Sequence, residues 1–271
     1  MEELRVSAKV SIIMGIYNCS ATLSQAIESI IDQTFTEWKL IMCDDGSVDD
    51  TAVVAQNYVN KYPDKIILVK NEKNMGLNYT LNHCLKYADT KYVARMDGDD
   101  ISLPQRLEKE FNFLESHPEY AIVSTPMIYF DEKGDFRTGT NEGEPNVNSF
   151  VRGTPFCHAP CMVRREAYTA VSGYSVSDKR LRVEDWDLWV RMYAKGYKGC
   201  VYGEPLYKMR DDRNALARRK FKYRFNEVRV IAFAVKELKL SKINYIWVFR
   251  PIIAGLVPKF IYEFVHKRNL K

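Results

Sequence analysis

The stretch Tyr92-Val93-Ala94-Arg95-Met96-Asp97-Gly98-Asp99-Asp100 is an apolar run that ends in three carboxylates within four positions. The apolar part predicts a buried strand, and the acids predict a site at the end of that strand. Like charges this close repel one another, so a cation is expected to neutralise them. A divalent ion carrying phosphate is one candidate, because Mg²⁺ typically takes one or two carboxylates together with substrate phosphates. A solvated turn is the alternative, since Asp and Gly are ordinary loop residues.

Strand and helix patterns alternate four times up to and beyond this stretch. Apolar runs predict strands at 10–16, 39–43 and 66–69, the opening stretch 92–100 is the fourth strand, and helical spacing predicts helices at 21–33, 49–62, 77–88 and 104–115. Short joins between alternating elements indicate an α/β fold, with a mostly parallel central sheet and helices on both faces. Ligands of such sheets bind beyond the carboxyl ends of the strands. One rim is therefore expected to carry Tyr17-Asn18, Asp44-Asp45, Asn71 to Gly76 and Asp97 to Asp100.

Other phosphate and metal patterns are missing from the sequence. No G-x-G-x-x-G follows the first strand and no G-x-x-x-x-G-K-[ST] occurs, which disfavours a dinucleotide-binding domain and a P-loop. The six cysteines lack the spacing of a zinc site and are expected to be free thiols. The amino terminus has no basic-then-apolar signal pattern, so a cytoplasmic protein is expected.

A second acidic cluster, Glu184-Asp185-Trp186-Asp187, follows a less regular region. Residues 121–130 predict a strand, 131–134 a hairpin turn and 137–148 a polar loop. Trp186, Trp189, Val190 and Tyr193 share one helical face, so the acids are expected in the first turn of a helix. Two interpretations stay open: the acids act in catalysis, or they only complement the helix dipole.

The chain is electrically bipolar. Residues 1–212 contain 25 Lys and Arg against 32 Asp and Glu, whereas residues 213–271 contain 15 against 3. This asymmetry predicts a main domain, 1–212, and a basic, aromatic, helical C-terminal region, 213–271. Within that region, 213–237 predicts a helix whose apolar stripe includes Phe221 and Phe225. Residues 243–265 are apolar but are interrupted too often to form a spanning helix.

Two explanations of the C-terminal region stay open. It could lie on an anionic membrane surface, as interfacial segments rich in Lys and Arg do. It could instead pack on the protein's own core or in a homodimer, because an amphipathic pattern does not separate these cases. Nucleic acid is not the expected partner, since the body of the chain is net negative and the tail ends in bulky apolar residues. The expected location is peripheral, on the inner face of the plasma membrane.

In combination, the motifs resemble the family 2 inverting glycosyltransferases, of the bacterial surface-polysaccharide type, which have the GT-A fold. The resemblance covers residues 8–210. It is carried by the order and spacing of Ser11 to Asn18, Gln33-Thr34, Asp44 to Ser47, Asn74 to Gly76, the D-x-D match Asp97-Gly98-Asp99, and Glu184-Asp185 before an aromatic helix. Gly15 stands where the family usually has Pro, at a position that is backbone scaffold.

The resemblance implies a role for each site residue. The donor-binding residues it implies are Tyr17, Asn18, Asp44, Asp45, Asn74, Arg95 and Asp97. Among them, Asp45 with Asp44 beside it would recognise the nucleotide base, and Asp97 would hold the ribose or the metal. Asp99 would be the direct ligand of Mn²⁺ or Mg²⁺. Asp185 would be the catalytic base, with Glu184 adjacent as the weaker candidate.

The chemistry of these residue types agrees with the resemblance. A metal stabilises the charge that builds on a leaving diphosphate, and a positioned carboxylate removes the proton of an attacking hydroxyl. We therefore expect a metal-dependent, inverting hexosyl transfer from a nucleotide sugar, above all a UDP-sugar, to a glycan or lipid-linked glycan in cell-surface polysaccharide synthesis. The alternative is a non-catalytic nucleotide-binding or membrane-binding subunit of a glycan synthase. The presence of both acid clusters argues against that alternative.

Overall fold

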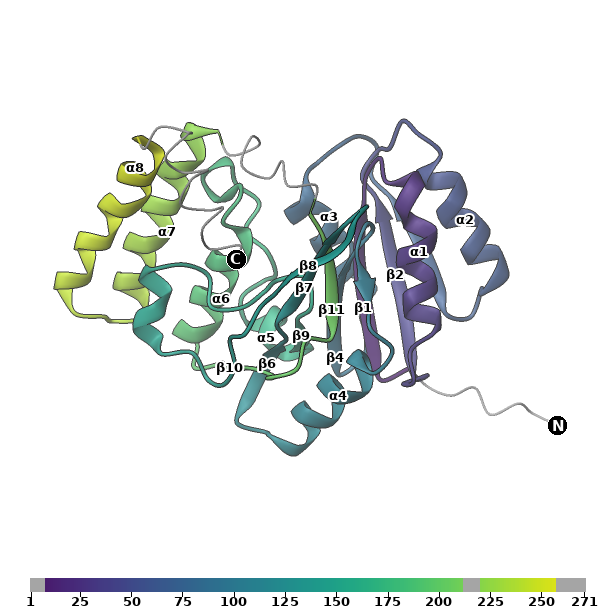
Figure 1. Ribbon diagram of the computed structural model, residues 1–271, viewed down its shortest axis with the longest axis horizontal. Coiled ribbons are helices and arrows are strands. Elements are labelled where there is room, and N and C mark those ends of the chain that lie inside the picture. Colours follow the sequence, from purple (N-terminus) through teal and green to yellow (C-terminus); the bar gives the residue numbers. More distant parts are fainter. Residues whose placement is uncertain (1–7, 212–219, 257–271) are drawn as a thin grey trace.

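The computed structural model describes residues 8–211 and 220–256. Within these ranges the central element is a seven-stranded sheet (Figure 1). Its strands lie in the order β10 (Lys198–Val201), β6 (Tyr120–Ser124), β9 (Met162–Arg164), β4 (Tyr92–Asp97), β1 (Val10–Ile16), β2 (Trp38–Asp44) and β3 (Ile66–Lys70). Only β9 among these strands runs antiparallel to its neighbours, β4 and β6. The predicted mostly parallel sheet is confirmed.

Helices cover both faces of this sheet, as predicted. On one face, α1 (Ser20–Ile31), α2 (Thr51–Lys61) and α4 (Arg106–Ser116) share a core with Ile12, Met14 and Met42. On the other, α3 (Leu77–Leu85), α5 (Arg165–Ala170) and α6 (Glu184–Ala194) share a core with Ile13, Ile41 and Val93. Successive side chains of a strand point to opposite faces. The continuous apolar runs of the sequence are therefore strands buried on both sides.

A smaller sheet adjoins the carboxyl end of β4. In the described residues it has the order β5 (Ile101–Ser102), β11 (Tyr207–Arg210), β7 (Met127–Asp131) and β8 (Gly134–Thr138). The single strand predicted at 121–130 is wrong, because it divides into β6 and β7, which join different sheets. Pro126 lies at the break and has no N–H to donate to a strand ladder. The hairpin turn predicted at 131–134 joins β7 to β8. The loop predicted at 137–148 is wrong at its two ends, because Arg137 and Thr138 belong to β8 and Val147 and Asn148 begin a 3-10 helix. Between these ends, Gly143 pairs with Val201.

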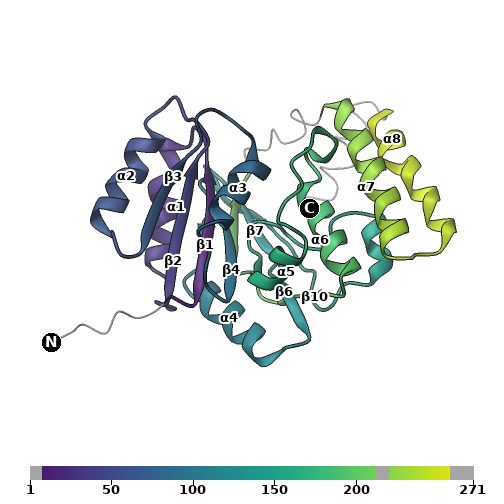
Figure 2. The same cartoon turned by 180° about the vertical axis from the view of Figure 1, so that it is seen from behind.

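A helical layer lies at the end of the molecule opposite α1 and α2 (Figure 2). It contains α7 (Arg224–Glu237) and α8 (Phe249–Leu256), joined by the 3-10 helix η4 (Lys242–Val248). Shorter 3-10 helices are η1 (Val147–Val151), η2 (Asp178–Arg180) and η3 (Phe221–Tyr223). Val230, Ile231 and Ala234 of α7 are buried in the same core as Trp189 of α6. The described part of the basic region therefore packs on the main domain.

Details of the predicted C-terminal region differ from the structure. The apolar stripe assigned to Phe221 and Phe225 is wrong, because these side chains are 45% and 47% exposed. The face of α7 that contains Val230 and Ala234 turns towards α6 instead. The boundary at 212/213, the helix start at 213 and residues 257–265 lie outside the described residues. None of the described helices is both long enough and apolar enough to cross a bilayer.

Candidate active site

The acidic turn Asp97 to Asp100 leaves the carboxyl end of β4 and is held in place by β11. The Asp97 N–H donates to the Tyr207 hydroxyl at 3.2 Å, and the Arg210 N–H donates to the Asp100 carboxylate at 2.8 Å. The Arg210 guanidinium also donates to the backbone carbonyl of Asp99 at 3.0 Å. Gly98 is required at the tip, since a Cβ there would lie 2.9 Å from the Cys19 sulfur. The turn is thus fixed by residues more than a hundred positions further along the chain.

Negative charge in this turn is only partly compensated. Arg95 is buried under the turn and donates to the Asp97 carboxylate at 2.5 Å. Asp100 is 3% exposed, and burial together with repulsion from Asp97 and Asp99 raises the pKa of its carboxyl to about 8. Asp99 is the exposed member of the three. A cation beside Asp97 and Asp99 would relieve this repulsion.

The donor atoms of the turn fit a hard divalent ion. Carboxylate oxygens are the ligands that Mg²⁺ and Mn²⁺ prefer. Among the described residues, no group of three or more acidic, histidine or cysteine side chains converges on one point that could hold a metal. A metal bound here would have two carboxylates available, Asp97 and Asp99, and its further oxygen ligands would come from substrate phosphates or water, as is usual for Mg²⁺.

The rim next to this turn carries Asp44 and Asp45 at the end of β2. Both are nearly buried. The Asp45 carboxylate accepts hydrogen bonds from the Asn71 amide at 2.7 Å and from the Met75 and Gly76 N–H groups at 2.8 and 2.9 Å. Asp45 thus anchors the loop that contains Asn74, which is exposed. Asp44 accepts a hydrogen bond from the Ser47 N–H at 3.1 Å.

Tyr17 and Asn18 stand beside this pair at the end of β1. Tyr17 is 47% exposed, so its ring is available to a ligand. Asn18 adopts a left-handed backbone conformation with φ of 47°, which Asn tolerates better than most residues. Its side-chain oxygen accepts from the Val48 N–H at 2.9 Å, and its own N–H donates to the Ser47 hydroxyl at 3.1 Å. The structure therefore brings the ends of β1 and β2 together, as the rim prediction requires.

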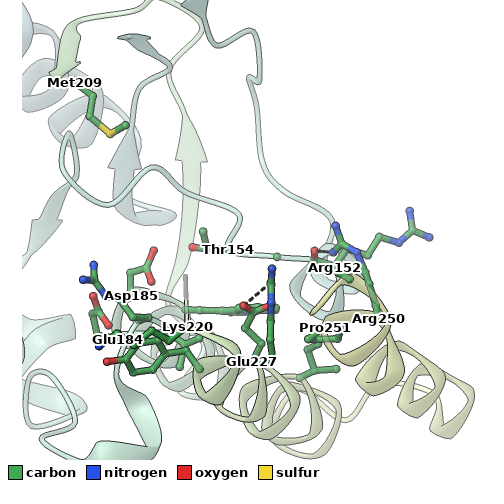
Figure 3. A pocket seen from close by; sticks show the side chains of 17 residues that line it. Arg152, Thr154, Glu184, Asp185, Met209, Lys220, Glu227, Arg250 and Pro251 are labelled. Atoms are coloured by element: carbon green, nitrogen blue, oxygen red, sulfur yellow. Dashed lines mark hydrogen bonds and ion pairs between the residues drawn. The ribbon is translucent and has the colours of Figure 1, made fainter. Parts of the chain in front are cut away.

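The second acidic cluster is the first turn of α6, as predicted. Glu184 and Asp185 are half-buried and line a cavity of about 730 Å³ (Figure 3). Burial raises the pKa of the Asp185 carboxyl, while the backbone N–H of Trp186 and the charge of Arg95 act in the opposite direction. A carboxylate with a raised pKa is a stronger general base. The cavity and the direction of the pKa shift are therefore those that a general base at Asp185 would require.

Asp187, one residue beyond Trp186, is different. It is 1% exposed and accepts hydrogen bonds from the Arg180 and Arg191 guanidinium groups at 2.5 and 2.8 Å and from the Ser175 hydroxyl at 2.7 Å. Asp187 is therefore a structural anchor that ties α6 to the preceding loop.

Arg95 links the two acidic clusters. Its guanidinium pairs with Asp97, and its positive charge partly opposes the rise in pKa that burial causes at Glu184 and Asp185. The Nε atom of Arg95 is buried and has no hydrogen-bond partner within the described residues. The resemblance implies a donor contact for Arg95, and in the structure its buried side chain contacts Asp97.

Several residues of the site were missed from the sequence. Tyr207 and Arg210 hold the acidic turn, and Asn71 joins the predicted rim through Asp45. Asn71 could have been found, because it opens a polar segment after the third strand. Nothing local marks Tyr207 or Arg210, since their strand is short and pairs with elements distant in the sequence.

Comparisons with known proteins agree with this architecture. The chain matches the family model described as Glycosyl transferase family 2 over residues 11–171, and that of Glycosyl transferase family group 2 over residues 92–258. It is 42% identical to EpsE of Bacillus subtilis, a protein named as a glycosyltransferase, over 97% of this chain and 94% of that one. It is 31% identical to the Escherichia coli UDP-Glc:alpha-D-GlcNAc-diphosphoundecaprenol beta-1,3-glucosyltransferase WfaP, over 70% of this chain and 72% of that one.

Solved structures show the same fold. S. aureus TarS 1–349 in complex with UDP superposes with a TM-score of 0.70 at 18% identity, over 89% of this chain and 71% of that one. The mannosyltransferase PcManGT from Pyrobaculum calidifontis, in complex with GDP-Man and Mn²⁺, superposes with a TM-score of 0.59 at 17% identity, over 92% and 69% of the two chains. The predicted GT-A fold is confirmed. With a family model that covers more than half of its length, the chain belongs to glycosyl transferase family 2 and is a glycosyltransferase.

Proposed function

We propose that this glycosyltransferase moves a hexosyl group, with inversion, from a UDP-sugar to a hydroxyl of a lipid-linked glycan in the synthesis of a surface polysaccharide. The observation that carries the proposal is Asp185, which is half-buried in a large cavity and linked through Arg95 to the acidic turn of β4. WfaP is named as an enzyme that uses UDP-Glc as donor and a diphosphoundecaprenol-linked sugar as acceptor, which supports a UDP-sugar donor and a lipid-linked acceptor. The UDP complex of TarS supports the nucleotide.

The donor would lie along the rim of the sheet. Tyr17, Asn18, Asp44 and Asn74 would line the base and ribose end, and Asp45 would act mainly by holding the loop of Asn74. Asp97 and Asp99 would hold Mn²⁺ or Mg²⁺ together with the diphosphate. When bound, the metal would supply Lewis-acid stabilisation of the charge on the leaving diphosphate. Arg95 would orient Asp97 for this task.

The acceptor hydroxyl would be activated by Asp185. The hydroxyl oxygen attacks the anomeric carbon, its proton passes to the Asp185 carboxylate, and the bond from the anomeric carbon to the diphosphate oxygen breaks. Attack from the face opposite the leaving group inverts the anomeric configuration. Glu184 lies next to Asp185, and burial together with the charge of Asp185 raises the pKa of its carboxyl. Glu184 is the weaker candidate for the base.

Thermal shift measurements with a panel of nucleotide sugars and Mn²⁺ test the donor assignment. A specific ligand stabilises the folded state by RT ln(1 + [L]/Kd), so the true donor should raise the melting temperature most. Slow UDP release from that donor, with water as acceptor, would then demonstrate catalysis. Tight binding without any UDP release would favour a non-catalytic nucleotide-binding subunit instead.

We further propose that the region from residue 213 associates with the anionic inner face of the membrane. Its support is an exposed apolar surface on η4 and α8, where Ile246, Phe249, Ile253 and Leu256 are more than 60% exposed. Basic residues occur throughout the same region, and such a combination binds anionic bilayers.

Sedimentation with anionic vesicles tests this part. The Phe249→Glu/Ile253→Glu double variant should stay in the supernatant while the parent protein pellets. Arg229→Glu changes an exposed residue of α7, outside this apolar surface of η4 and α8, and serves as a control for a general loss of positive charge. If the parent protein stays in the supernatant, membrane association is wrong and the apolar surface is expected to be a homodimer interface. Size-exclusion chromatography with light scattering would detect that homodimer.

A further inference from the structure

The cavity beside Asp185 has two chemically different ends. Glu184 and Asp185 of α6 lie at one end, and Arg152 and Arg250 lie at the other (Figure 3). Thr154 and residues of α7 lie between them. A cavity of about 730 Å³ falls within the size range of natural ligand pockets. The space is thus large enough to hold a sugar at the acidic end and a further group at the cationic end.

Within the described residues, the positive charge around this cavity is only partly neutralised by ion pairs. Five cationic side chains line the cavity, from four separate segments of the chain: Arg152, Arg182, Lys220, Arg224 and Arg250. Arg224 is paired with Glu227 at 2.8 Å. The other four form no ion pair with any carboxylate of residues 8–211 and 220–256. Cations gathered around one cavity without carboxylate partners favour the entry of an anion.

Two of these arginines are held in place by local contacts. The Arg152 guanidinium lies over the Trp247 ring, 4.8 Å from its centroid. The Arg250 guanidinium donates to the backbone carbonyl of Arg152. These contacts fix the side chains without cancelling their charge, and a planar guanidinium binds phosphate oxygens in a bidentate manner. The cationic end is therefore preorganised for a phosphate group.

Helix α8 connects this end of the cavity to the exposed apolar surface. Arg250, Pro251 and Ala254 line the cavity, while Phe249 and Ile253, on the other side of the same helix, are each 62% exposed. The residues that line the cavity and the exposed apolar residues thus lie on opposite faces of one helix. That arrangement suits a molecule whose phosphate is attached to a membrane-embedded chain.

We propose that the cationic end of this cavity binds the diphosphate of a lipid-linked sugar acceptor, so that the acceptor's hydroxyl is presented to Asp185. This proposal rests on the glycosyltransferase function proposed above and adds the substrate group that these arginines recognise. The donor diphosphate is a less suitable occupant. Its negative charge would be balanced by the metal that the acidic turn is proposed to hold at the rim, and of the residues of β11 only Met209 lines the cavity.

Titration calorimetry with farnesyl diphosphate tests this assignment, in the presence of saturating UDP and Mn²⁺ so that the donor site is filled. The full-length protein should bind farnesyl diphosphate. The Arg152→Gln/Arg250→Gln double variant should bind it at least tenfold more weakly, because charge-assisted hydrogen bonds are the strong ones. Lys236→Gln, an exposed cation of α7 outside the cavity, is the matched control and should bind like the parent.

Two comparison ligands distinguish the contribution of the phosphates to binding from that of the lipid chain. Farnesol should not bind, because it lacks the phosphates, and inorganic pyrophosphate should bind more weakly than farnesyl diphosphate, because it lacks the chain. Equal affinity for pyrophosphate would overturn the lipid part of the proposal. Absent binding of farnesyl diphosphate, or binding unaffected by the arginine double variant, would overturn the phosphate site itself. A loss of UDP affinity in this variant would reassign the arginines to the donor.

The failure of the proposed function would look different from these outcomes. In that case the parent protein would bind no nucleotide in the presence of Mn²⁺, before any acceptor analogue is added. With UDP binding intact, the result with farnesyl diphosphate concerns only the acceptor site.

Discussion

The acidic turn after β4 and the acidic start of α6 look alike in sequence. In the structure, the acids of each cluster divide in the same way. Each contains acids that face the site and one acid that is buried. Asp97 and Asp99 stand at the rim, whereas Asp100 is 3% exposed; Glu184 and Asp185 line the cavity, whereas Asp187 is 1% exposed. The buried acids differ in their partners, since Asp187 pairs with two arginines, whereas Asp100 has the Arg210 N–H and the Tyr207 hydroxyl and no ion pair within the described residues. An acid's partners, and not its place in a motif, therefore decide its task.

Asp185→Asn is expected to have the largest effect on turnover. The amide cannot accept the hydroxyl proton, so kcat should fall by about 10²–10⁴, the usual contribution of a general base. Calorimetric UDP affinity in Mn²⁺ should stay within about twofold, and the melting temperature should not fall, because a half-buried carboxylate is replaced by a neutral group of the same shape. An undiminished kcat would remove Asp185 from the mechanism.

Asp187→Asn, two positions away, is expected to act on stability instead. It leaves the Arg180 and Arg191 guanidinium groups without their carboxylate, and breaking a buried ion pair costs about 3 kcal/mol or more. The urea midpoint should fall while the m-value stays constant. Per folded molecule, kcat should remain close to that of the parent. A variant that is stable but inactive would place Asp187 in the chemistry and erase the contrast with Asp185.

Asp99→Ala should weaken Mn²⁺-dependent UDP binding by about 10–100-fold, since even the loss of an outer partner of a metal site commonly costs that much. UDP binding measured in EDTA should change little, because the base and ribose contacts remain. Asp32→Ala, an exposed acid at the end of α1, controls for charge alone. Equal UDP binding by the parent and Asp99→Ala in Mn²⁺ would indicate that residues 97–100 form only a solvated turn and bind no metal.

The fold and the rim could be predicted from the sequence because their signals are local. The run from Tyr92 to Met96 and the helix starting at Glu184 both follow from periodicity, and parallel strands necessarily bring their carboxyl ends to one edge. The partners of each acid could not be predicted in this way. Arg210 reaches Asp100 across 110 positions, and the cationic end of the cavity combines Arg152 and Arg250 from separate segments. Such convergence depends on tertiary packing, for which the sequence carries no local pattern.

Asp100→Asn gives the smallest expected effect and the sharpest test of the acidic turn, because that effect depends on pH. In the folded protein the pKa of Asp100 is raised from 3.8 to about 8, so the folded state holds a proton that the unfolded state has lost. Stability from this group is complete below pH 3.8 and is lost as the pH rises towards 8. In EDTA, the urea midpoint of the parent should therefore fall more steeply between pH 5 and 9 than that of Asp100→Asn. Mn²⁺ should reduce this difference, since a nearby cation favours the ionised carboxylate. Parallel pH profiles in EDTA would show that Asp100 is ionised throughout, and that the turn does not need a cation to balance its charge.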